Sequence, residues 1–321
     1  MSGKWAMIAA VLYGAAFGPG PSKAAELAEG PVSVLVGFGP GGLGDIVTRV
    51  VANSMASSLG KSFVVQNMPG ASGMGAASAA TRARPDGSTI LLVSGQNAAS
   101  PSLFEKMPYN PDDLAGLSTL GLFNFVFVAK KDSEIKNIES MLAYAKKDPD
   151  KFNIGTISTG SAQNLAALLF LSKVGVKAQT IPFKSTGELV TALSGGHIQV
   201  LVETVPGVLG QIQSGELQAL AVSSPETLSY LPGVPTFRSL GIDFELTSWN
   251  GFMVPAKTPR PIIELLNAHV RKAMEDPEIK DKLVKLGLTP KAGSPEQLDA
   301  LYKEDEARWR QVITDAKIAK Q

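Results

Sequence analysis

The sequence has no cysteine and only two histidines, and these shortages exclude several kinds of site. Without cysteine there is no disulfide scaffold, no thiolate zinc site and no cysteine nucleophile. His197 and His269 lie far apart in the chain, which excludes a metal site built on several histidines. We therefore expect neither a bound metal nor a cofactor.

An excess of charge of one sign is also missing. Lys and Arg number 30 against 29 Asp and Glu, which gives a formal net charge of +1. We expect no nucleic-acid partner, because such a partner requires a strongly basic face. Charged residues make up 18% and hydrophobic residues 44%, which indicates a globular rather than a disordered chain. The 321 residues suffice for about two domains.

No apolar run is long enough to span a bilayer, which takes about 20 residues. The run from Trp5 to Phe17 follows Lys4 and precedes a Gly-Pro-Gly-Pro stretch with small residues after it. This pattern is typical of a secretory signal peptide over residues 1–24, cleaved after Ala24 or Ala25. We therefore expect an exported protein, periplasmic in a cell with two membranes and without a lipidated cysteine as anchor.

Short apolar runs alternate with helical patterns along the chain, which predicts βαβ units and an α/β fold. Strands are expected at 32–36, 63–66, 89–93, 123–129, 153–157, 179–182, 200–203, 219–222 and 249–254. Helices are expected at 45–59, 73–82, 138–146, 162–173, 187–194, 208–214, 261–275, 277–286 and 295–316.

Two blocks of the chain, near 32–93 and 153–222, share the order strand, Gly-rich turn, helix and strand. The helices after the second block could return to cover the first. We therefore predict two doubly wound lobes, with the chain crossing between them near 123–129 and 246–254. In such sheets a ligand lies beyond the carboxyl ends of the strands. The predicted limits are 25–125 with 250–321 for lobe 1, and 126–249 for lobe 2.

A Gly-rich motif, Gly37-Phe38-Gly39-Pro40-Gly41-Gly42, lies between the first strand and the first helix. Its glycines fit G-x-G-x-x-G, the dinucleotide fingerprint, which also requires an acid at the end of the second strand. That strand ends in Gln66-Asn67, and Pro40 removes one amide, so both features disfavour NAD. A Gly-rich turn that opens a helix still suits an anion, whereas an isolated motif would indicate only a tight turn.

Two more strand ends carry neutral donors. The segment 155–161 precedes a helix, and Ser158, Thr159 and Ser161 could cap that helix or bind a ligand oxygen. The segment 94–97, Ser-Gly-Gln-Asn, follows the third strand. Arg and Lys are absent from these loops, so we predict that an anion is held by amides and hydroxyls, whose charge-assisted bonds contribute about 1.5–3 kcal/mol each.

Four other side chains near these loops have two interpretations each. Asp45 suits the first turn of its helix, and we favour that placement over ligand contact. Glu203 could contact a ligand hydroxyl or amine, or could be a solvated loop acid. Lys184 could face the ligand, although we expect it to face solvent, and for Trp249 we expect packing.

Catalytic signatures are missing. The sequence has no G-x-S-x-G elbow, and Gly60-Lys61-Ser62 lacks the first glycine of a P-loop. Two S-x-x-K matches, at 58–61 and 133–136, lack the accompanying S-D-N and K-T-G elements. We therefore do not expect an enzyme.

A series of motifs in order over most of the chain resembles one known family. They are Pro40-Gly41-Gly42-x-x-Asp45, 65–71 (VQNMPGA), 85–91 (PDGSTIL), 107–111 (MPYNP), Gly160-Ser161, 182–184 (PFK), Gly195-Gly196, 219–222 (ALAV), 231–236 (LPGVPT) and 248–251 (SWNG). The sequence is similar to the extracytoplasmic solute receptors of tripartite tricarboxylate transporters, the Bug or TctC-like family. The resemblance implies a type II periplasmic-binding-protein fold, whose two lobes close over a ligand.

The resemblance also implies a site and a function. It implies a monomeric, non-enzymatic receptor that captures a small carboxylate and delivers it to membrane permease subunits. Two alternative functions are a ligand-sensing partner of a two-component sensor kinase and, less favoured, an NAD-dependent enzyme. Family patterns differ at Asn164, Ala167-Leu168, Gln199 and Glu203, which leaves the ligand open. The implied ligand-binding residues are Phe38, Gly41, Gly42, Leu43, Asp45, Ser94, Gln96, Asn97, Ser158, Thr159, Gly160, Ser161, Gln163, Glu203 and Thr204.

Overall fold

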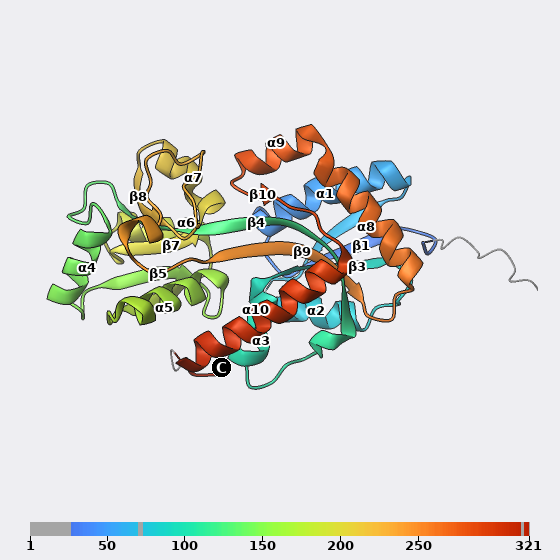
Figure 1. Ribbon diagram of the computed structural model, residues 1–321, viewed down its shortest axis with the longest axis horizontal. Coiled ribbons are helices and arrows are strands. Elements are labelled where there is room, and N and C mark those ends of the chain that lie inside the picture. The colour runs from blue at the N-terminus through green and yellow to red at the C-terminus, as the bar shows by residue number, and fades with distance from the viewer. Residues whose placement is uncertain (1–26, 70–72, 316–317, 321) are drawn as a thin grey trace, which may run out of the picture.

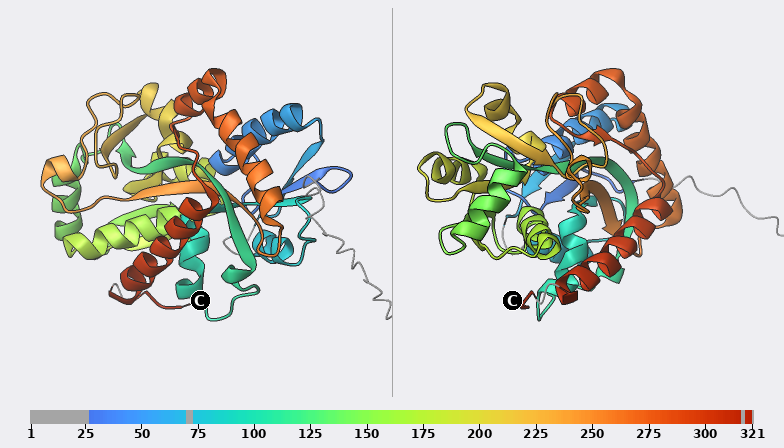
Figure 2. Two further views of the ribbon diagram at one scale, coloured as in Figure 1. Left: turned by 45° about the vertical axis from the view of Figure 1, so that its right-hand side comes forward. Right: turned by 60° about the vertical axis from the view of Figure 1, so that its left-hand side comes forward.

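The computed structural model describes residues 27–69, 73–315 and 318–320 (Figure 1). The expected signal peptide at 1–24 lies outside these residues. Within them, no helix combines the length and the apolar character that crossing a bilayer requires. Helices and strands alternate over most of this part of the chain, and they form two halves that lie side by side (Figures 1 and 2).

The first half is built on a sheet in which parallel and antiparallel strands mix. Its strand order is β2-β1-β3-β9-β4, with β10 paired to β4. The pairs β1–β2 and β1–β3 are parallel, and β9 runs antiparallel to its two neighbours. The strands are β1 (Val32–Val36), β2 (Phe63–Asn67), β3 (Thr89–Ser94), β4 (Leu114–Lys130), β9 (Thr247–Pro255) and β10 (Thr289–Pro290). The helices are α1 (Leu43–Leu59), α2 (Met74–Thr81), α3 (Gly95–Leu103), α8 (Arg260–Glu275), α9 (Pro277–Lys285) and α10 (Pro295–Asp315).

The second half is built on the far end of β4. Here β4 pairs with β7 on one side and β8 on the other, and the order continues to β5 and β6. The pairs β5–β6 and β5–β7 are parallel, so that their carboxyl ends lie at one edge. The elements are α4 (Ile138–Lys147), β5 (Asn153–Ile157), α5 (Ala162–Val174), β6 (Gln179–Phe183), α6 (Thr186–Ser194), β7 (Val200–Thr204), α7 (Val205–Gln213) and β8 (Leu217–Val222).

Two neighbouring strand segments connect the halves. On β4, pairing with β9 ends at Asn124 and pairing with β7 begins at Phe125. The chain returns at Leu246, whose N–H donates to Ser223 O at 2.9 Å directly before β9 begins. The Ser223 hydroxyl accepts a hydrogen bond from Phe125 N at 2.9 Å and donates one to Leu246 O. One hydroxyl therefore ties the two connecting segments together.

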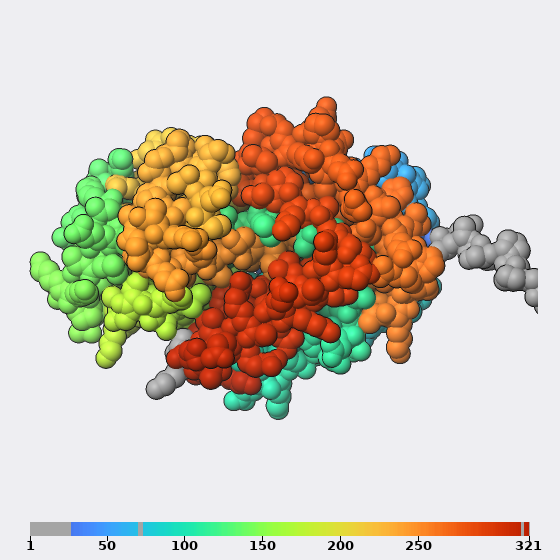
Figure 3. Space-filling view, viewed as in Figure 1, coloured from blue at the N-terminus to red at the C-terminus, as the bar shows by residue number. Residues whose placement is uncertain are grey.

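The C-terminal helix α10 packs on α3 and β4 of the first half. It forms the red surface over the middle of the molecule in Figure 3. Trp249 Nε1 donates to Asp305 Oδ2 of this helix at 2.7 Å. Tyr302 OH donates to Asn97 O at 2.9 Å. Both contacts are buried, so the last helix of the chain holds the start of α3 and the middle of β9 in place.

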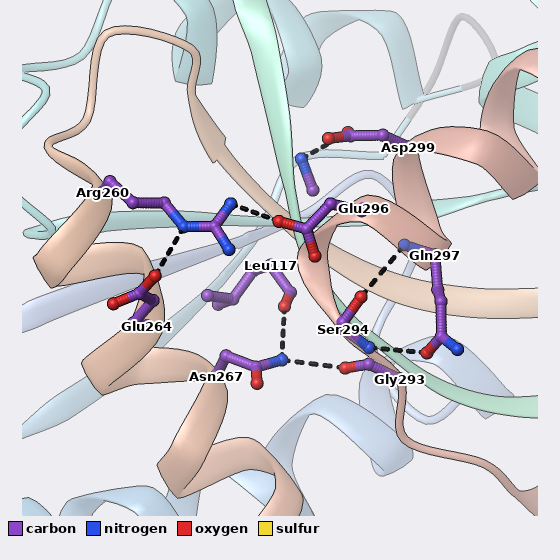
Figure 4. A network of polar contacts seen from close by, with 10 residues as sticks. Leu117, Arg260, Glu264, Asn267, Gly293, Ser294, Glu296, Gln297 and Asp299 are labelled. Atoms are coloured by element: carbon purple, nitrogen blue, oxygen red, sulfur yellow. Dashed lines mark hydrogen bonds and ion pairs between the residues drawn. The ribbon is translucent and has the colours of Figure 1, made fainter.

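Polar contacts anchor the start of α10 to the sheet (Figure 4). Asn267 Nδ2 of α8 donates to Leu117 O and to Gly293 O, at 2.7 and 2.8 Å. The Asp299 carboxylate accepts from Gly116 N at 2.6 Å. The bonds to Leu117 O and from Gly116 N lie at an irregular part of β4, where the β4–β9 register shifts between Gly116 and Ser118.

Strand β4 and helix α3 show how the structure departs from the sequence-based expectation. Strand β4 begins at Leu114 rather than 123, because two register shifts interrupt the apolar pattern of its first half. The segment 94–97 was expected to be a loop, but it opens helix α3 with Ser94 at the N-cap position. Almost every residue of α3 is buried, so the helix has no polar face from which a helical period could be recognised.

Close backbone packing fixes the turn after β1. A methyl group on Gly37 would lie 2.5 Å from the Gly73 Cα atom, whereas one on Gly39 would meet nothing within 4 Å. We predict that Gly37→Ala lowers the free energy of unfolding by about 1–3 kcal/mol, because the backbone must move. The control Gly39→Ala should stay within about 0.5 kcal/mol of the unsubstituted protein. Denaturant unfolding followed by circular dichroism measures both, and equal stability of the two variants would contradict the packing described.

Candidate functional site

A cavity of about 510 Å³ lies between the two halves. Its walls come from strand ends and from the first turns of five helices, α1, α3, α5, α6 and α7. This convergence follows from the topology, because the helix after a strand begins at the carboxyl end of that strand. Helix N-termini carry free N–H groups and a partial positive charge, so the walls favour an anion.

The loop between β1 and α1 presents backbone to the cavity. Gly42 is the N-cap residue of α1, and no side chain caps this 17-residue helix. Gly42, Leu43 and Gly44 all line the cavity. The N–H groups of the first turn have no intrahelical acceptor, so they are available to a ligand oxygen.

Asp45 fixes the loop between β1 and α1 through hydrogen bonds. Its carboxylate accepts hydrogen bonds from Gly41 N at 2.9 Å, from Arg49 Nε at 3.0 Å and from Asn67 Nδ2 at 2.9 Å. Burial raises the pKa of Asp45, but the bonds from Arg49, Gly41 and Asn67 outweigh it and lower the pKa below its usual value. The carboxylate therefore stays ionised and fixes the loop, and it does not line the cavity.

Two polar residues on neighbouring strands line the cavity, and each has a buried side-chain atom that lacks a partner within the described residues. Ser94 on β3 pairs with Asn250 on β9, and these residues are only 3% and 2% exposed. Within the described chain, Ser94 Oγ and Asn250 Nδ2 make no hydrogen bond. Ser94 lies in a capping-box arrangement with Asn97, whose Oδ1 accepts from Ser94 N, but the hydroxyl itself lacks good hydrogen-bond geometry. An unpaired buried polar group costs about 1–3 kcal/mol, which a ligand would remove.

Glu203 at the end of β7 is a buried acid in the opposite wall, 2% exposed. Its Oε1 accepts hydrogen bonds from Gln163 Nε2 and Thr204 N, both at 2.6 Å, and its Oε2 accepts one from Thr186 Oγ1 at 2.9 Å. Burial raises the pKa of Glu203, and the bonds from Gln163, Thr204 and Thr186 oppose this shift without cancelling it.

The rest of the lining is apolar apart from one cation and a few neutral polar groups. Lys184 is exposed, as expected from the sequence, but it also lines the cavity. The cavity thus has a lysine in its lining, although the three loops at 37–42, 94–97 and 155–161 contain none. The larger apolar lining residues are Phe38, Leu43, Ile46, Phe123, Ile157 and Leu286.

The cavity gathers many of the residues that the sequence indicated. Those in its lining are Phe38, Gly41, Gly42, Leu43, Ser94, Gln96, Gln163, Glu203 and Thr204. Those outside its lining are Asp45, Asn97, Ser158, Thr159, Gly160 and Ser161.

The second group has other contacts. Ser161 caps α5, because its Oγ accepts from Asn164 N and donates to Ile157 O. Gly160 N donates to Asn164 Oδ1, whereas Ser158 and Thr159 are exposed. The residues of this turn that reach the cavity are its flanks, Ile157, Ala162 and Gln163.

Sequence reasoning also missed lining residues. The segments 185–187 and 206–207 follow β6 and β7, so the rule that strand ends meet could have identified them. Phe123 and Asn250 lie inside strands and carried no such signal. Elsewhere, a hollow of about 450 Å³ between α3 and the end of the chain contains none of the implied site residues. In the described part of the chain, no cluster of His, Asp or Glu could hold a metal ion.

Curated relatives match most of the chain. The family described as "Tripartite tricarboxylate transporter family receptor", TctC, matches residues 47–318. A UPF0065 protein of Agrobacterium vitis, from the TAR-I ttuE-ttuC' intergenic region, is 33% identical over 291 residues, covering 89% of this chain and 84% of that protein. Protein BugT of Bordetella pertussis is 32% identical over 289 residues, covering 89% of each.

Solved structures are similar over the same extent. The periplasmic binding protein BugD has 30% identity and a TM-score of 0.84, covering 92% of this chain and 100% of that one. R. palustris Rpa4515 with adipate has 26% identity and a TM-score of 0.86, with 92% and 100% covered. MatC from Rhodopseudomonas palustris with bound malate has 29% identity and a TM-score of 0.80, with 88% and 98% covered. The expected periplasmic-binding-protein fold is confirmed, and the chain belongs to the tripartite tricarboxylate transporter receptor family, TctC, a family of periplasmic solute-binding receptors.

Proposed function

We propose that this receptor binds a small carboxylate in the cavity between its halves and delivers it to the permease of a tripartite transporter. The observation that carries the proposal is the convergence of five helix N-termini on one cavity, whose lining also includes Ser94 and Asn250, each with a buried polar atom that lacks a partner within the described residues. Adipate and malate in the similar structures support the same class of ligand. The proposed ligand contacts are the first-turn amides of α1, Ser94, Gln96, Asn250, Gln163, Glu203 and Thr204.

The energies of these groups are sufficient for useful affinity. Each helix terminus contributes about 0.3–1 kcal/mol to an anion, and each charge-assisted hydrogen bond about 1.5–3 kcal/mol. Against this stands the loss of carboxylate hydration, which costs several kcal/mol. A net free energy of about −8 kcal/mol corresponds to a micromolar dissociation constant. Such an affinity permits both capture and release.

Closure of the two halves around the ligand would give the permease a signal to recognise. We propose lobe limits near those expected from the sequence, 25–125 with 250–321 and 126–249. In support, the pairing partner of β4 changes between Asn124 and Phe125, and the chain returns at Leu246.

The proposed receptor is a non-enzymatic monomer, exported by a signal peptide at 1–24 and active in the periplasm.

Isothermal titration tests the ligand class directly. The panel pairs adipate, malate and benzoate with 1,6-hexanediol, 1,6-diaminohexane and benzamide as controls without a carboxylate. We expect at least one carboxylate to bind with a dissociation constant on the order of micromolar, and every control to bind more weakly. Folded protein that binds no carboxylate, or that binds the controls equally well, would contradict the proposal.

Two substitutions at Gly42, the N-cap residue of α1, distinguish the effect of charge on ligand binding from the effect of side-chain shape. Gly42 has a φ of −74° and its nearest potential neighbour lies 3.6 Å away, so a side chain fits there. Asp and Asn are both good N-cap residues, which preserves the helix in either variant. We predict that Gly42→Asp binds the carboxylate at least about tenfold more weakly than Gly42→Asn, since like charges 4 Å apart repel by about 4 kcal/mol at an effective dielectric constant near 20. Equal affinities by calorimetry would exclude this loop from the site.

The buried Glu203 should reduce the stability of the unliganded protein. Because its pKa is raised on folding, its destabilising effect is absent below the usual carboxyl pKa and develops as the pH rises through the folded-state value. We predict that Glu203→Gln raises the melting temperature at pH 7.5, and that the gain shrinks as the pH approaches 4. The exposed Glu216→Gln is the matched control and should show no such dependence. A pH-independent effect of Glu203→Gln would refute the assignment.

A further inference from the structure

Glu203 is an anomaly in a cavity that favours anions. It is the acidic side chain in the lining, and it lies at the N-terminus of α7 beside the first turns of α5 and α6. A second carboxylate would therefore be repelled from this wall, whatever the rest of the cavity attracts. The presence of an acid here points to a ligand group of a different kind.

The hydrogen bonds of Glu203 leave room for one more donor. An ionised carboxylate has about four acceptor sites, and Gln163 Nε2, Thr204 N and Thr186 Oγ1 occupy three of them, with the Thr204 hydroxyl as a further neutral neighbour. Two of these bonds end on Oε1 and one on Oε2, so Oε2 is the oxygen with fewer hydrogen bonds. A methyl group on Gly207 would lie 2.8 Å from Glu203 Cγ, and the absence of a side chain there keeps the carboxylate in this position.

The charged surroundings of Glu203 are sparse. Among the described residues that line the cavity, Lys184 is the other charged side chain, and Glu203 forms no ion pair in that part of the chain. The groups that contact its oxygens from α5, α6 and α7 are all neutral. Burial raises the pKa of Glu203, whereas the three N–H and O–H donors aimed at its oxygens oppose that shift and favour the ionised form, which accepts hydrogen bonds and donates none.

The unpaired donors lie some distance away along β4. Asn250 is opposite Gly121 and Glu203 is opposite Val126, so their backbones are separated along this strand by roughly 16 Å at about 3.3 Å per residue. Phe123 lies between the two positions on β4 and lines the cavity. A ligand that contacts both walls therefore crosses an apolar surface.

We propose that the ligand is a carboxylate that carries, across an apolar spacer, a second group that donates a hydrogen bond, such as an amide, an ammonium or a hydroxyl group. Glu203 accepts that hydrogen bond and determines specificity against simple dicarboxylates. This inference rests on the proposed carboxylate-binding function, and it goes beyond it in assigning the other end of the ligand.

Pairs of ligands with equal length test this inference by calorimetry at pH 7.5. Each pair consists of a dicarboxylate and its monoamide: succinate and succinamate, glutarate and glutaramate, adipate and adipamate. We expect the monoamide of the best-fitting pair to bind at least about tenfold more tightly than its diacid, a difference of about 1.4 kcal/mol. In Glu203→Gln, which removes the charge and keeps the shape, this ratio should fall to about one or reverse.

The exposed Glu216→Gln, which makes the same chemical change on the surface of the second half, should keep the ratio of the unsubstituted protein. Diacids that bind as tightly as their monoamides would overturn the inference while leaving carboxylate binding intact. A monoamide preference that survives in Glu203→Gln would overturn the role of Glu203. Folded protein that binds no compound of either type would overturn the proposed function itself.

Discussion

Strand β4 takes part in two sheets at once, and the position of every cavity wall depends on this. Its first part pairs with β9 and its last part with β7 and β8, so the carboxyl ends of β1 and β3 come to face those of β5, β6 and β7. The helices that follow these strands then begin at a common space. The positive ends of five helices are therefore brought together by strand pairing, without a cluster of Arg or Lys.

Two buried acids near this space have opposite roles because their surroundings differ. Asp45 lies beside Arg49, and its hydrogen bonds lower its pKa, so it serves as a fixed anchor for the turn after β1. Glu203 has only neutral partners, and burial raises its pKa. The ionised form of Asp45 is stabilised by its surroundings, and its oxygens already accept hydrogen bonds from Gly41, Arg49 and Asn67. Glu203 is held at a cost in stability, which is typical of a residue retained for binding.

The shape of the cavity also depends on residues far from it in the sequence. Asp305 and Tyr302 of the last helix bond to Trp249 Nε1 and to Asn97 O, which flank Asn250 and Ser94. A C-terminal helix that could have been a solvated surface element instead fixes the start of α3. The network around Asn267 and Asp299 in turn fixes the start of that helix on β4 (Figure 4).

The sequence by itself determined the alternation of strands and helices, because helical periodicity and turn glycines such as Gly41 and Gly60 act over a few residues. It also indicated the turn at 37–42, which follows an apolar strand, and the acid at 203, which lies near the end of one. Only the tertiary structure decided that Ser94 and Asn250 are neighbours, because that pairing joins distant segments. It likewise placed Phe123 in the cavity, since that position depends on which strands lie side by side and not on local pattern.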